Sequence, residues 1–371
     1  MSSNPKSIIT KLCASAGITI GGSEPWDLIV HDERFYARVL AQSSMGLGES
    51  YMDGWWDAAA VDLFIEKVAL GNLQDQIRYD LPTMISYLRG TLLNMQRAHF
   101  EEVGERHYDI GNDLYERMLD RRLIYSCGYW ASATTLDEAQ EAKLDLICRK
   151  LGLKPGMQIL DIGSGWGGLL KFAAERYGVS GVGITISKEQ AAYANAHTDG
   201  LPVETRLMDY LALEGQFDRV VSVGMFEHVG YKNYRAYMRK VRSLLKPDGL
   251  FLLHTIGGNY TARHGDPFTE KYIFPHGMLP SSTQISRATE HLFVMEDWHN
   301  FGADYDKTLM AWHANFEAAW PALESAYNQR FYRMWRYYLL SAAGLFRARR
   351  EQLWQVVLSP EGVRGGYRAP R

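Results

Sequence analysis

Four glycines in one short segment are the residues of this 371-residue sequence whose spacing most directly indicates a ligand site. The segment Met157–Gly168 reads MQILDIGSGWGG, an apolar run typical of a buried strand followed by glycines at 163, 165, 167 and 168. Glycine permits positive φ angles and lets a backbone approach a ligand closely. A helix over 168–177 would direct its free N–H groups at that ligand. The G-x-G-x-x-G spacing alone predicts only a nucleotide-like ligand.

Other residues whose side chains could bind a ligand or take part in a reaction lie where strands are expected to end. Apolar runs predict strands near 158–162, 180–185, 203–207, 217–223 and 248–256, with helices between them. This alternation predicts an α/β fold with a doubly wound, mostly parallel, Rossmann-like sheet, whose ligands lie at the carboxyl ends of the strands. The residues expected at those ends are Gly163, Thr185, Asp209, Glu227, His228 and His254.

The flanking sequence predicts a second, smaller domain. We expect a helix-rich N-terminal domain over 1–95, a linker over 96–104 and the catalytic domain over 105–371. Further expected elements are a strand at 27–30, helices at 32–41 (capped by Asp32), 63–70, 81–95, 135–151 (with a Thr135–Glu138 capping box), 306–327 and 329–349, and strands at 296–298 and 353–358.

Two aromatic clusters in this region carry further expectations. The segment 46–56 contains flexible glycines and the vicinal pair Trp55-Trp56, which suit either a seam between domains or an interfacial contact. Segments 105–113 and 125–130 are dense in His, Tyr, Trp and small residues, and we expect them to form a lid over the ligand.

Composition excludes several classes of protein. With 46% hydrophobic and 22% charged residues the chain is an ordinary folded protein, and its net charge of −3 argues against a nucleic-acid partner. Three cysteines show no metal-ligand spacing, so we expect a reduced, cytoplasmic chain without a metal site. No run of 18 apolar residues occurs, so any membrane contact would be peripheral. Residues 330–371 contain nine arginines and two acidic residues. This excess of positive charge indicates either a solvated basic surface or a contact with an anionic surface.

The end of the second strand separates the nucleotide classes. A nicotinamide enzyme would normally place an acid there, but the sequence has none until Glu189, which disfavours a dehydrogenase. Asp161 before the glycines and Asp209 after the third strand instead resemble the S-adenosylmethionine-dependent methyltransferases. That resemblance implies an aminocarboxyl group near the glycine turn and an adenine near Asp209-Tyr210. The expected cofactor-binding set is Tyr125, Ser126, Asp161, Gly163, Ser164, Gly165, Gly167, Gly168, Thr185, Gln190, Asp209 and Tyr210.

A narrower resemblance covers nearly the whole chain from Ser15 onward. The segments 46–56 (GLGESYMDGWW), 105–113, 125–130, 163–168, 222–230 (SVGMFEHVG), 253–257 (LHTIG), 272–275 (YIFP), 296–305 (EDWHNFGADY) and 346–357 are similar to the cyclopropane-fatty-acyl-phospholipid synthase family. The resemblance implies methylene transfer from S-adenosylmethionine to the cis double bond of an unsaturated acyl chain in a membrane phospholipid. It also implies a homodimer, a lipid-engaging N-terminal domain and a peripheral location at the inner face of the membrane.

The implied chemistry needs three things from the residues. An alkene is a poor nucleophile, so it must be held close to the sulfonium methyl group. The resulting carbocation is stabilised by aromatic faces, and Tyr125, Tyr129, Trp130, Phe226 and Tyr305 are candidates. A base must then remove a proton so that the ring closes. The resemblance implies that bound bicarbonate is this base, held by Cys127, Glu227, His254, Tyr305 and the backbone of Ile256.

Plainer interpretations remain open for each residue. Cys127 suits a small buried hydrophobe, and His228 and His254 suit packed or hydrogen-bonded side chains. Glu227 is the strongest candidate, because a carboxylate at a strand's ligand end needs a reason to be there. A methyltransferase that makes a methyl-branched or methylene acyl chain is the first alternative function, and a non-catalytic lipid- or nucleotide-binding protein is the second.

Two departures from the family pattern bear on mechanism. Ser164 stands where relatives often carry Cys, and since a small side chain remains we expect no loss. Near the C-terminus, the family resemblance implies a Cys that could act as a nucleophile. The segment 341–344 of this chain reads Ser-Ala-Ala-Gly, so no thiol is present there and covalent catalysis through that position is excluded.

Overall fold

The computed structural model describes residues 4–73 and 111–371, which divide into two compact units. The first unit contains residues 4–73 together with Arg263–Pro275 and Tyr305–Glu351. The second contains the remaining described residues. Two segments of the expected catalytic domain therefore group with the N-terminal residues. The expected linker at 96–104 and the helix at 81–95 lie outside the described residues, so the domain boundary remains a prediction.

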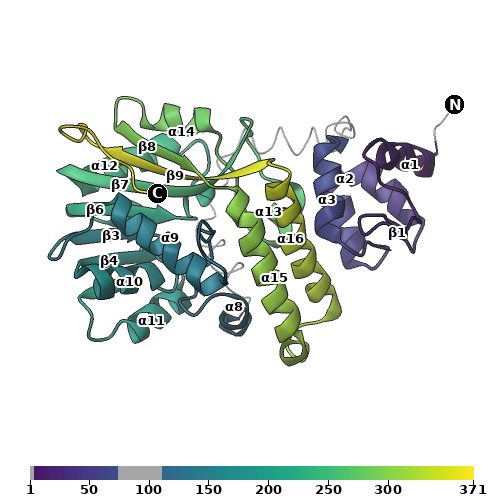
Figure 1. Cartoon of the computed structure of the whole chain (residues 1–371), viewed down its shortest axis with the longest axis horizontal. Coiled ribbons are helices and arrows are strands. Elements are labelled where there is room, and N and C mark those ends of the chain that lie inside the picture. Colours follow the sequence, from purple (N-terminus) through teal and green to yellow (C-terminus); the bar gives the residue numbers. More distant parts are fainter. Residues whose placement is uncertain (1–3, 74–110) are drawn as a thin grey trace. The chain divides into compact units, whose positions relative to one another are not determined.

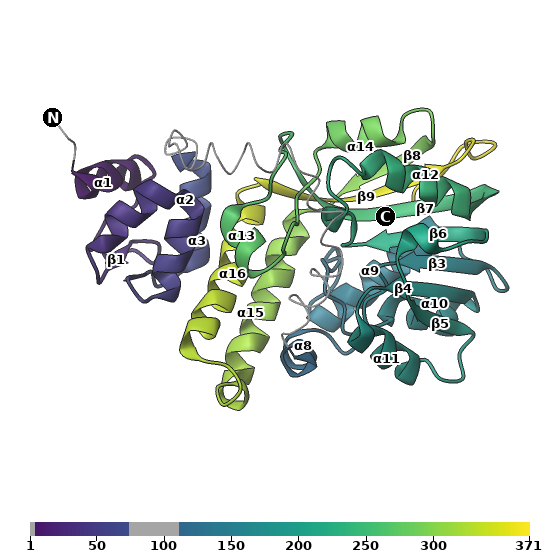
Figure 2. The same cartoon turned by 180° about the vertical axis from the view of Figure 1, so that it is seen from behind.

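The second unit is built on a seven-stranded sheet with the order β5-β4-β3-β6-β7-β9-β8 (Figures 1 and 2). The strands are β3 Gln158–Ile162, β4 Ser180–Thr185, β5 Val203–Leu207, β6 Phe217–Val223, β7 Leu245–Gly258, β8 Val294–Asn300 and β9 Glu351–Ser359. The pairs β3–β4, β4–β5, β3–β6 and β6–β7 are parallel, and β8–β9 is antiparallel. The predicted fold class is confirmed. One strand is longer than expected: β7 runs past His254, which therefore lies inside the strand rather than at its end.

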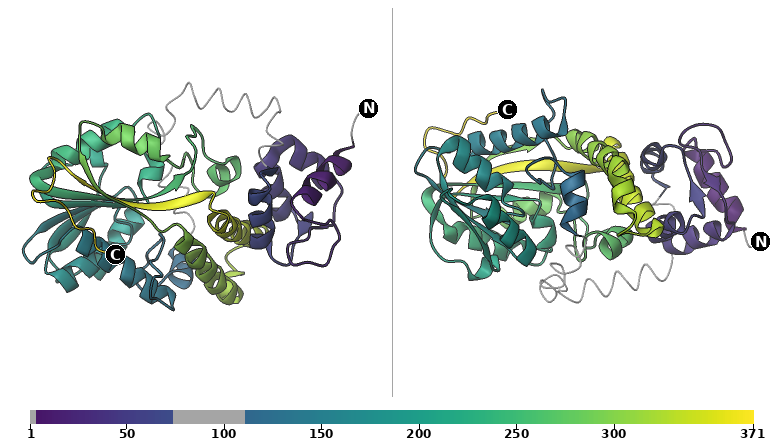
Figure 3. Two further views of the ribbon diagram at one scale, coloured as in Figure 1. Left: turned by 45° about the horizontal axis from the view of Figure 1, so that its top comes forward. Right: turned by 90° about the horizontal axis from the view of Figure 1, so that it is seen from below.

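Helices cover both faces of this sheet because its strands are apolar on both sides. Ile159 packs with residues of α9 (Leu136–Lys150) and α10 (Gly168–Tyr177), whereas its neighbour Leu160 packs with residues of α12 (Tyr234–Leu244) and α14 (Ser282–Thr289). This alternation follows from the two-residue period of a strand. Figure 3 shows the blue and teal helices on one face and the green ones on the other. Further elements are α8 Asn112–Met118, α11 Lys188–His197, η1 Tyr210–Ala212 and η2 Phe226–His228.

The predicted capping box of α9 is confirmed. Thr135 Oγ1 accepts a hydrogen bond from Glu138 N at 3.3 Å, and Glu138 Oε2 accepts one from Thr135 N at 3.2 Å. Together they satisfy two donors at the helix start. This fixes the register of α9, whose inward face contacts the candidate site.

The first unit is mainly helical and packs around Trp56. Its elements are α1 Pro5–Ser15, β1 Ile29–Val30, α2 Arg34–Met52, β2 Trp56–Asp57, α3 Val61–Leu70, α13 Pro267–Tyr272, α15 Ala303–Leu323 and α16 Gln329–Arg347. Trp56 is fully buried and donates from Nε1 to the Leu47 carbonyl at 3.0 Å. Its ring lies 5.0 Å from Tyr51 and 5.1 Å from Phe64. Trp56 is therefore a core residue of this unit and not an exposed interfacial one. Its ring lies 6.3 Å from that of Tyr337, a residue of the expected catalytic domain, which agrees with the predicted seam between the expected domains.

The start and extent of α2 also differ from the sequence-based expectation. The helix begins at Arg34 with Glu33 at the N-cap, while Asp32 accepts from Arg34 N at 2.9 Å without being the cap. It continues to Met52 across a break at Ser43, so the glycines at 46 and 48 are helical rather than part of a flexible loop. A Cβ on Gly48 would lie 2.3 Å from the Phe268 ring, which explains the small residue.

Most of the C-terminal arginines make contacts inside their own unit. Arg347, for example, donates to Asp306 at 2.8–2.9 Å and to Asp62 at 2.7 Å. Arginines with such contacts are Arg330, Arg333, Arg336, Arg347, Arg350 and Arg371. Most of these positively charged side chains are therefore engaged in ion pairs or hydrogen bonds within the protein. Within 4–73 and 111–371, no helix combines the length and apolar character needed to cross a bilayer.

Candidate active site

The glycine turn joins β3 to α10 and needs its glycines. Gly163, Gly165 and Gly167 have φ angles of 85°, 54° and 81°, values that residues with a Cβ rarely adopt. The amides of residues 163 and 164 both donate to the Ile184 carbonyl at 3.0 Å, which ties the turn to the end of β4. A Cβ on Gly168 would lie 2.4 Å from the Arg122 carbonyl. The turn therefore lies at the carboxyl ends of β3 and β4, as predicted.

Ser164 fits this turn because β4 offers a glycine opposite it. A Cβ on Gly183 would be 2.6 Å from Ser164 Oγ, so the two positions can hold only one small side chain between them. Ser164 Oγ is buried and has no hydrogen-bond partner among the described residues. A buried hydroxyl of this kind is uncommon unless it serves a ligand.

The other expected cofactor residues are held around the turn by local contacts. Thr185 Oγ1 donates to Gln190 Oε1 at 2.8 Å, at the start of α11. Asp209 caps η1 by accepting from Leu211 N at 2.8 Å. Tyr210 is buried with its ring 5.2 Å from that of Tyr237. These side chains belong to the loops that follow β4 and β5, next to one another in the sheet.

Helix α8, which the sequence did not predict, positions Tyr125. Tyr115 of α8 packs 5.3 Å from the Tyr125 ring and 5.0 Å from the Trp166 ring in the glycine turn. Trp166 Nε1 also donates to Asn112 Oδ1 at 3.1 Å. Of the segments expected to form a lid, residues 111–113 lead into and begin α8 and residues 125–130 are described, while residues 105–110 lie outside the described chain; the lid itself remains a prediction.

Glu227 is held in η2, just after β6, and only half of its carboxylate has a partner. Oε1 accepts from the Ile256 amide at 2.7 Å, so two residues of the predicted base-holding set are in direct contact. Oε2 is buried and has no hydrogen-bond partner among the described residues. Burial raises the pKa of Glu227 to about 7, against the opposing effect of hydrogen bonds from its own backbone, from the Ile256 backbone and from the Thr255 side chain.

His254 lies in β7 beside Val223, the last residue of β6, and is almost fully buried. Its Nδ1 lies 3.3 Å from the side-chain Nε2 of Gln355, and with that amide nitrogen as the donor the ring proton is on Nε2. Nε2 has no hydrogen-bond partner in the described part of the chain. Burial, followed by the charges of Lys143 and Lys150, lowers the pKa of His254 well below its ordinary value. The ring is therefore neutral.

The remaining predicted catalytic residues lie in different places. Cys127 is fully buried in the second unit and donates from Sγ to the Gly128 carbonyl at 3.1 Å. Tyr305 belongs to the first unit, at the start of α15, with its ring 4.6 Å from Phe346. His228 follows Glu227 in η2 and is half-buried; desolvation of its ring lowers its pKa to about 4, so it is neutral. Among the described residues, no cluster of three or more His, Cys, Asp or Glu could hold a metal.

The sequence analysis did not identify Lys143 as a residue of the site. Lys143 is fully buried, donates a hydrogen bond to Ser126 and interacts electrostatically with Asp161. A signal was present: in α9 the buried side chains include Ala139, Gln140, Leu144 and Ile147, and Lys143 falls on the same helix stripe. A lysine at such a position needs buried partners.

A mostly parallel sheet of this order, with a glycine turn after its first strand, defines an α/β domain of the methyltransferase fold. A model of the mycolic acid cyclopropane synthetase family matches residues 95–356, and the chain belongs to that family. It is 53% identical over 365 residues to the cyclopropane-fatty-acyl-phospholipid synthase of Escherichia coli K12, covering 98% of this chain and 95% of the relative. It is 35% identical over 270 residues to cyclopropane mycolic acid synthase 1 of Mycobacterium tuberculosis, covering 68% and 94%. The chain is therefore an enzyme of the methyltransferase class.

Solved structures agree with this assignment. MmaA2, a cyclopropane synthase of M. tuberculosis, superimposes with a TM-score of 0.66 at 33% identity, covering 70% of this chain and 98% of that one. The mycolic acid cyclopropane synthase CmaA1, solved with SAH and CTAB, gives the same TM-score, identity and coverage. These structures cover 70% of this chain, so the chain has residues beyond the part that superimposes on those enzymes.

Proposed function

We propose that the enzyme transfers a methylene group from S-adenosylmethionine to the cis double bond of an unsaturated acyl chain in a membrane phospholipid. The name of the E. coli relative and its near-complete coverage of both chains support this substrate class. The SAH-bound relative supports the methyl donor, and the glycine turn supports its place. The proposed donor site comprises the cofactor-binding residues predicted above.

The observation that carries the proposal is the pair of partnerless polar atoms on Glu227 and His254. Both atoms are buried, and each belongs to a side chain whose other polar atom is already bonded. A carboxyl with a pKa of about 7 and a neutral imidazole donor suit a small anion that must be bound and must pass on a proton. Methyl transfer to an alkene leaves a carbocation, and ring closure requires removal of one proton from the new methyl group.

We assign the holding of bicarbonate to Cys127, Glu227, His254, Tyr305 and the backbone of Ile256. Bound bicarbonate would supply the base for that proton. Within this set, His254 Nε2–H would donate to an anion oxygen, and Glu227 would accept a proton at Oε2. The Ile256 amide fixes the Glu227 carboxyl group in the orientation that leaves Oε2 available. No residue of this set forms a covalent bond to the substrate.

The lipid substrate requires contact with a membrane surface. We propose that the protein is cytoplasmic and peripheral at the inner face, that it acts as a homodimer and that the N-terminal residues engage lipid. Internal ion pairs of the C-terminal arginines leave less free positive charge for that contact than the sequence alone indicated.

The test is to incubate the protein with S-adenosylmethionine and vesicles of unsaturated phospholipid, then weigh the released acyl chains. A gain of one CH2 with loss of the double bond is the expected product. A methyl-branched or methylene product would retain the donor but remove the ring-closing mechanism. It would favour an activity like that of the probable fatty acid methyltransferase of Pseudomonas putida, a 39% identical relative. An unchanged acyl mass with S-adenosylmethionine still bound would indicate another acceptor or a binding protein.

A further inference from the structure

A buried lysine on α9 contacts the turn that carries two of the predicted site residues. Lys143 has no exposed surface, and its Nζ donates to Ser126 Oγ at 2.7 Å. Fully buried lysines are rare in proteins, because the ammonium loses its hydration. Nothing in the proposed chemistry uses Lys143 directly, so its burial requires another explanation.

Gln140, one turn earlier on the same face of α9, contacts the same segment. Its Nε2 donates to the Ser126 carbonyl at 2.7 Å and to the Ile124 carbonyl at 3.4 Å. The Tyr129 amide donates to the Ala139 carbonyl at 2.9 Å. Helix α9 therefore contacts residues 124–129 at both ends of the segment. In the middle of the segment it bonds to Ser126 twice, to the hydroxyl through Lys143 and to the carbonyl through Gln140.

The charges around Lys143 fit this holding role. Asp120 is buried and accepts from the Ile124 amide at 2.8 Å and the Arg122 amide at 2.9 Å, so it fixes the entry to the same turn. Asp161, in β3, is buried next to Lys143, and burial raises its pKa to about 7. Burial also lowers the pKa of Lys143 to about 8, against the charges of Asp120, Cys127 and Asp161. One ammonium thus links the turn to the strand that precedes the glycines.

We infer that Lys143, together with Gln140, is a positioning residue that holds the Ser126–Gly128 turn in its buried conformation. The turn carries Ser126 and Cys127, predicted to bind the methyl donor and bicarbonate. The consequence for catalysis rests on the proposed function, whereas the holding of the turn does not. Loss of the Lys143 contact frees the turn to open locally while α9 itself stays folded.

The three cysteines of the chain provide a direct readout of such opening. Cys127 lies in the turn, Cys148 is buried further along α9, and Cys13 lies in the first unit. A thiol reagent modifies each buried cysteine only when its surroundings open, so labelling rates measured by peptide mass spectrometry report local opening at each site. Cys148 and Cys13 serve as internal references for global unfolding.

The experiment compares Lys143→Met, Lys143→Gln and Ser126→Ala with the unmodified protein. Lys143→Met and Ser126→Ala are expected to raise the Cys127 labelling rate at least tenfold and to change the Cys148 rate less than twofold. Lys143→Gln keeps a donor and is expected to show a smaller increase. Lys150→Met is the matched control, because Lys150 is equally buried on α9 but pairs with Asp297 at 3.1 Å.

Two results would overturn the inference: an unchanged Cys127 rate, or Cys127 and Cys148 rates that rise together. If Lys143→Met does not fold, Ser126→Ala and Lys143→Gln decide by the same criterion. SAH affinity measured by calorimetry separates this inference from the proposed function. An unmodified protein that fails to bind SAH would contradict the proposed function, but the labelling result would still decide the role of Lys143.

Discussion

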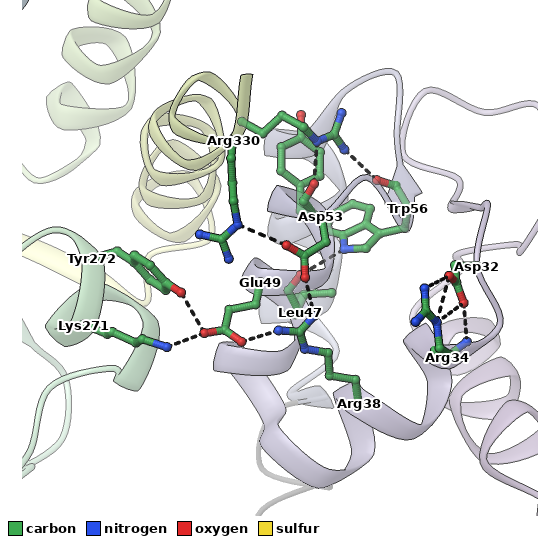
Figure 4. Close-up of polar contacts among 12 residues, drawn as sticks. Asp32, Arg34, Arg38, Leu47, Glu49, Asp53, Trp56, Lys271, Tyr272 and Arg330 are labelled. Carbon is green, nitrogen blue, oxygen red and sulfur yellow. Dashed lines mark hydrogen bonds and ion pairs between the residues drawn. The ribbon is translucent and has the colours of Figure 1, made fainter. Parts of the chain in front are cut away.

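Two buried glutamates, one in each unit, show how differently this protein treats a buried carboxylate. In the first unit, Glu49 receives hydrogen bonds from Lys271 at 2.6 Å, from Tyr272 at 2.8 Å and from Arg38 (Figure 4). In the second unit, Glu227 has one bonded oxygen and one without a partner among the described residues. Both residues expose less than a tenth of their surface. Their clearest difference lies in their hydrogen-bond partners.

The pKa values of the two carboxyl groups diverge for the same reason. Burial alone would raise both, and it raises that of Glu227 to about 7. At Glu49 the hydrogen bonds from Lys271, Tyr272 and Arg38 outweigh burial and lower the pKa to about 2. A fully bonded buried charge is typical of structure, whereas a buried polar group left unsatisfied needs a functional explanation. The contacts of Glu49 favour a stabilising role in its unit, whereas the unpartnered oxygen of Glu227 supports the role in the reaction proposed for it above.

The largest effect should come from Glu227→Gln. We expect the rate of product formation to fall by about 10²–10³, because an amide cannot accept the proton that ring closure releases. SAH affinity should stay within a few-fold of the unmodified value. Rates are measured by acyl-chain mass spectrometry at a temperature where the variant is folded. Glu49→Gln, measured under the same conditions, should lose less than tenfold. Equal losses of activity in the two variants would contradict the different roles assigned to Glu49 and Glu227.

The next largest effect is on stability, and here we expect the larger loss at Glu49 rather than at Glu227. Glu49→Gln should lower the free energy of unfolding by about 2 kcal/mol, because it removes the charge that accepts hydrogen bonds from Arg38, Lys271 and Tyr272, while Arg38 keeps its pair with Asp53. Urea titration followed by circular dichroism measures this change. Glu33→Gln removes an exposed ion pair with Lys6 and is expected to show no detectable change. A Glu49→Gln variant as stable as the Glu33→Gln control would contradict the structural role.

A third prediction concerns pH. The pKa of Glu227 is raised in the folded state, so its contribution to stability is complete below about pH 4.5 and is lost as pH rises through about 7. Glu227→Gln avoids this loss. The variant should therefore gain stability relative to the unmodified protein between pH 5 and pH 8, by up to about 3 kcal/mol. Paired urea titrations across this range measure the difference. A difference that is constant with pH would mean that the carboxyl group titrates normally.

The smallest effect is expected at Ser164. Since its buried Oγ has no partner among the described residues, Ser164→Ala should leave the melting temperature within about 2 °C of the unmodified value. If the hydroxyl serves the methyl donor, SAH affinity should fall by about three- to tenfold. Calorimetric binding and thermal melting check the two parts separately. A clear loss of stability without loss of affinity would make Ser164 a structural residue like Glu49.

The sequence was informative where structure is local. Strand positions followed from apolar runs, the α9 cap from Thr135 and Glu138, and the glycine turn from its spacing. Glu227 could be singled out because a carboxylate after a buried strand is unusual. Each of these signals is contained in a few consecutive residues.

Other features depend on contacts between distant residues, which a single sequence does not reveal. In α2, for example, Gly48 leaves room for Phe268, a residue more than 200 positions away whose ring packs against the helix backbone there. The role of Trp56 depends on Tyr337 in the same way. Lys143 was overlooked because its partners, Ser126 and Asp161, lie on other elements. Family resemblance named the residues of the base-holding set but not the contacts that hold them in place.

The most direct test of the central claim is the response to bicarbonate. We propose that the partnerless atoms of Glu227 and His254 bind this anion. Initial rates on unsaturated phospholipid vesicles would be measured in buffer freed of carbon dioxide, then after adding bicarbonate or acetate at constant pH. We predict that depletion lowers the rate of ring formation several-fold, that bicarbonate but not acetate restores it, and that Glu227→Gln does not respond. A rate that is unaffected by depletion, with the cyclopropane product confirmed, would contradict the account.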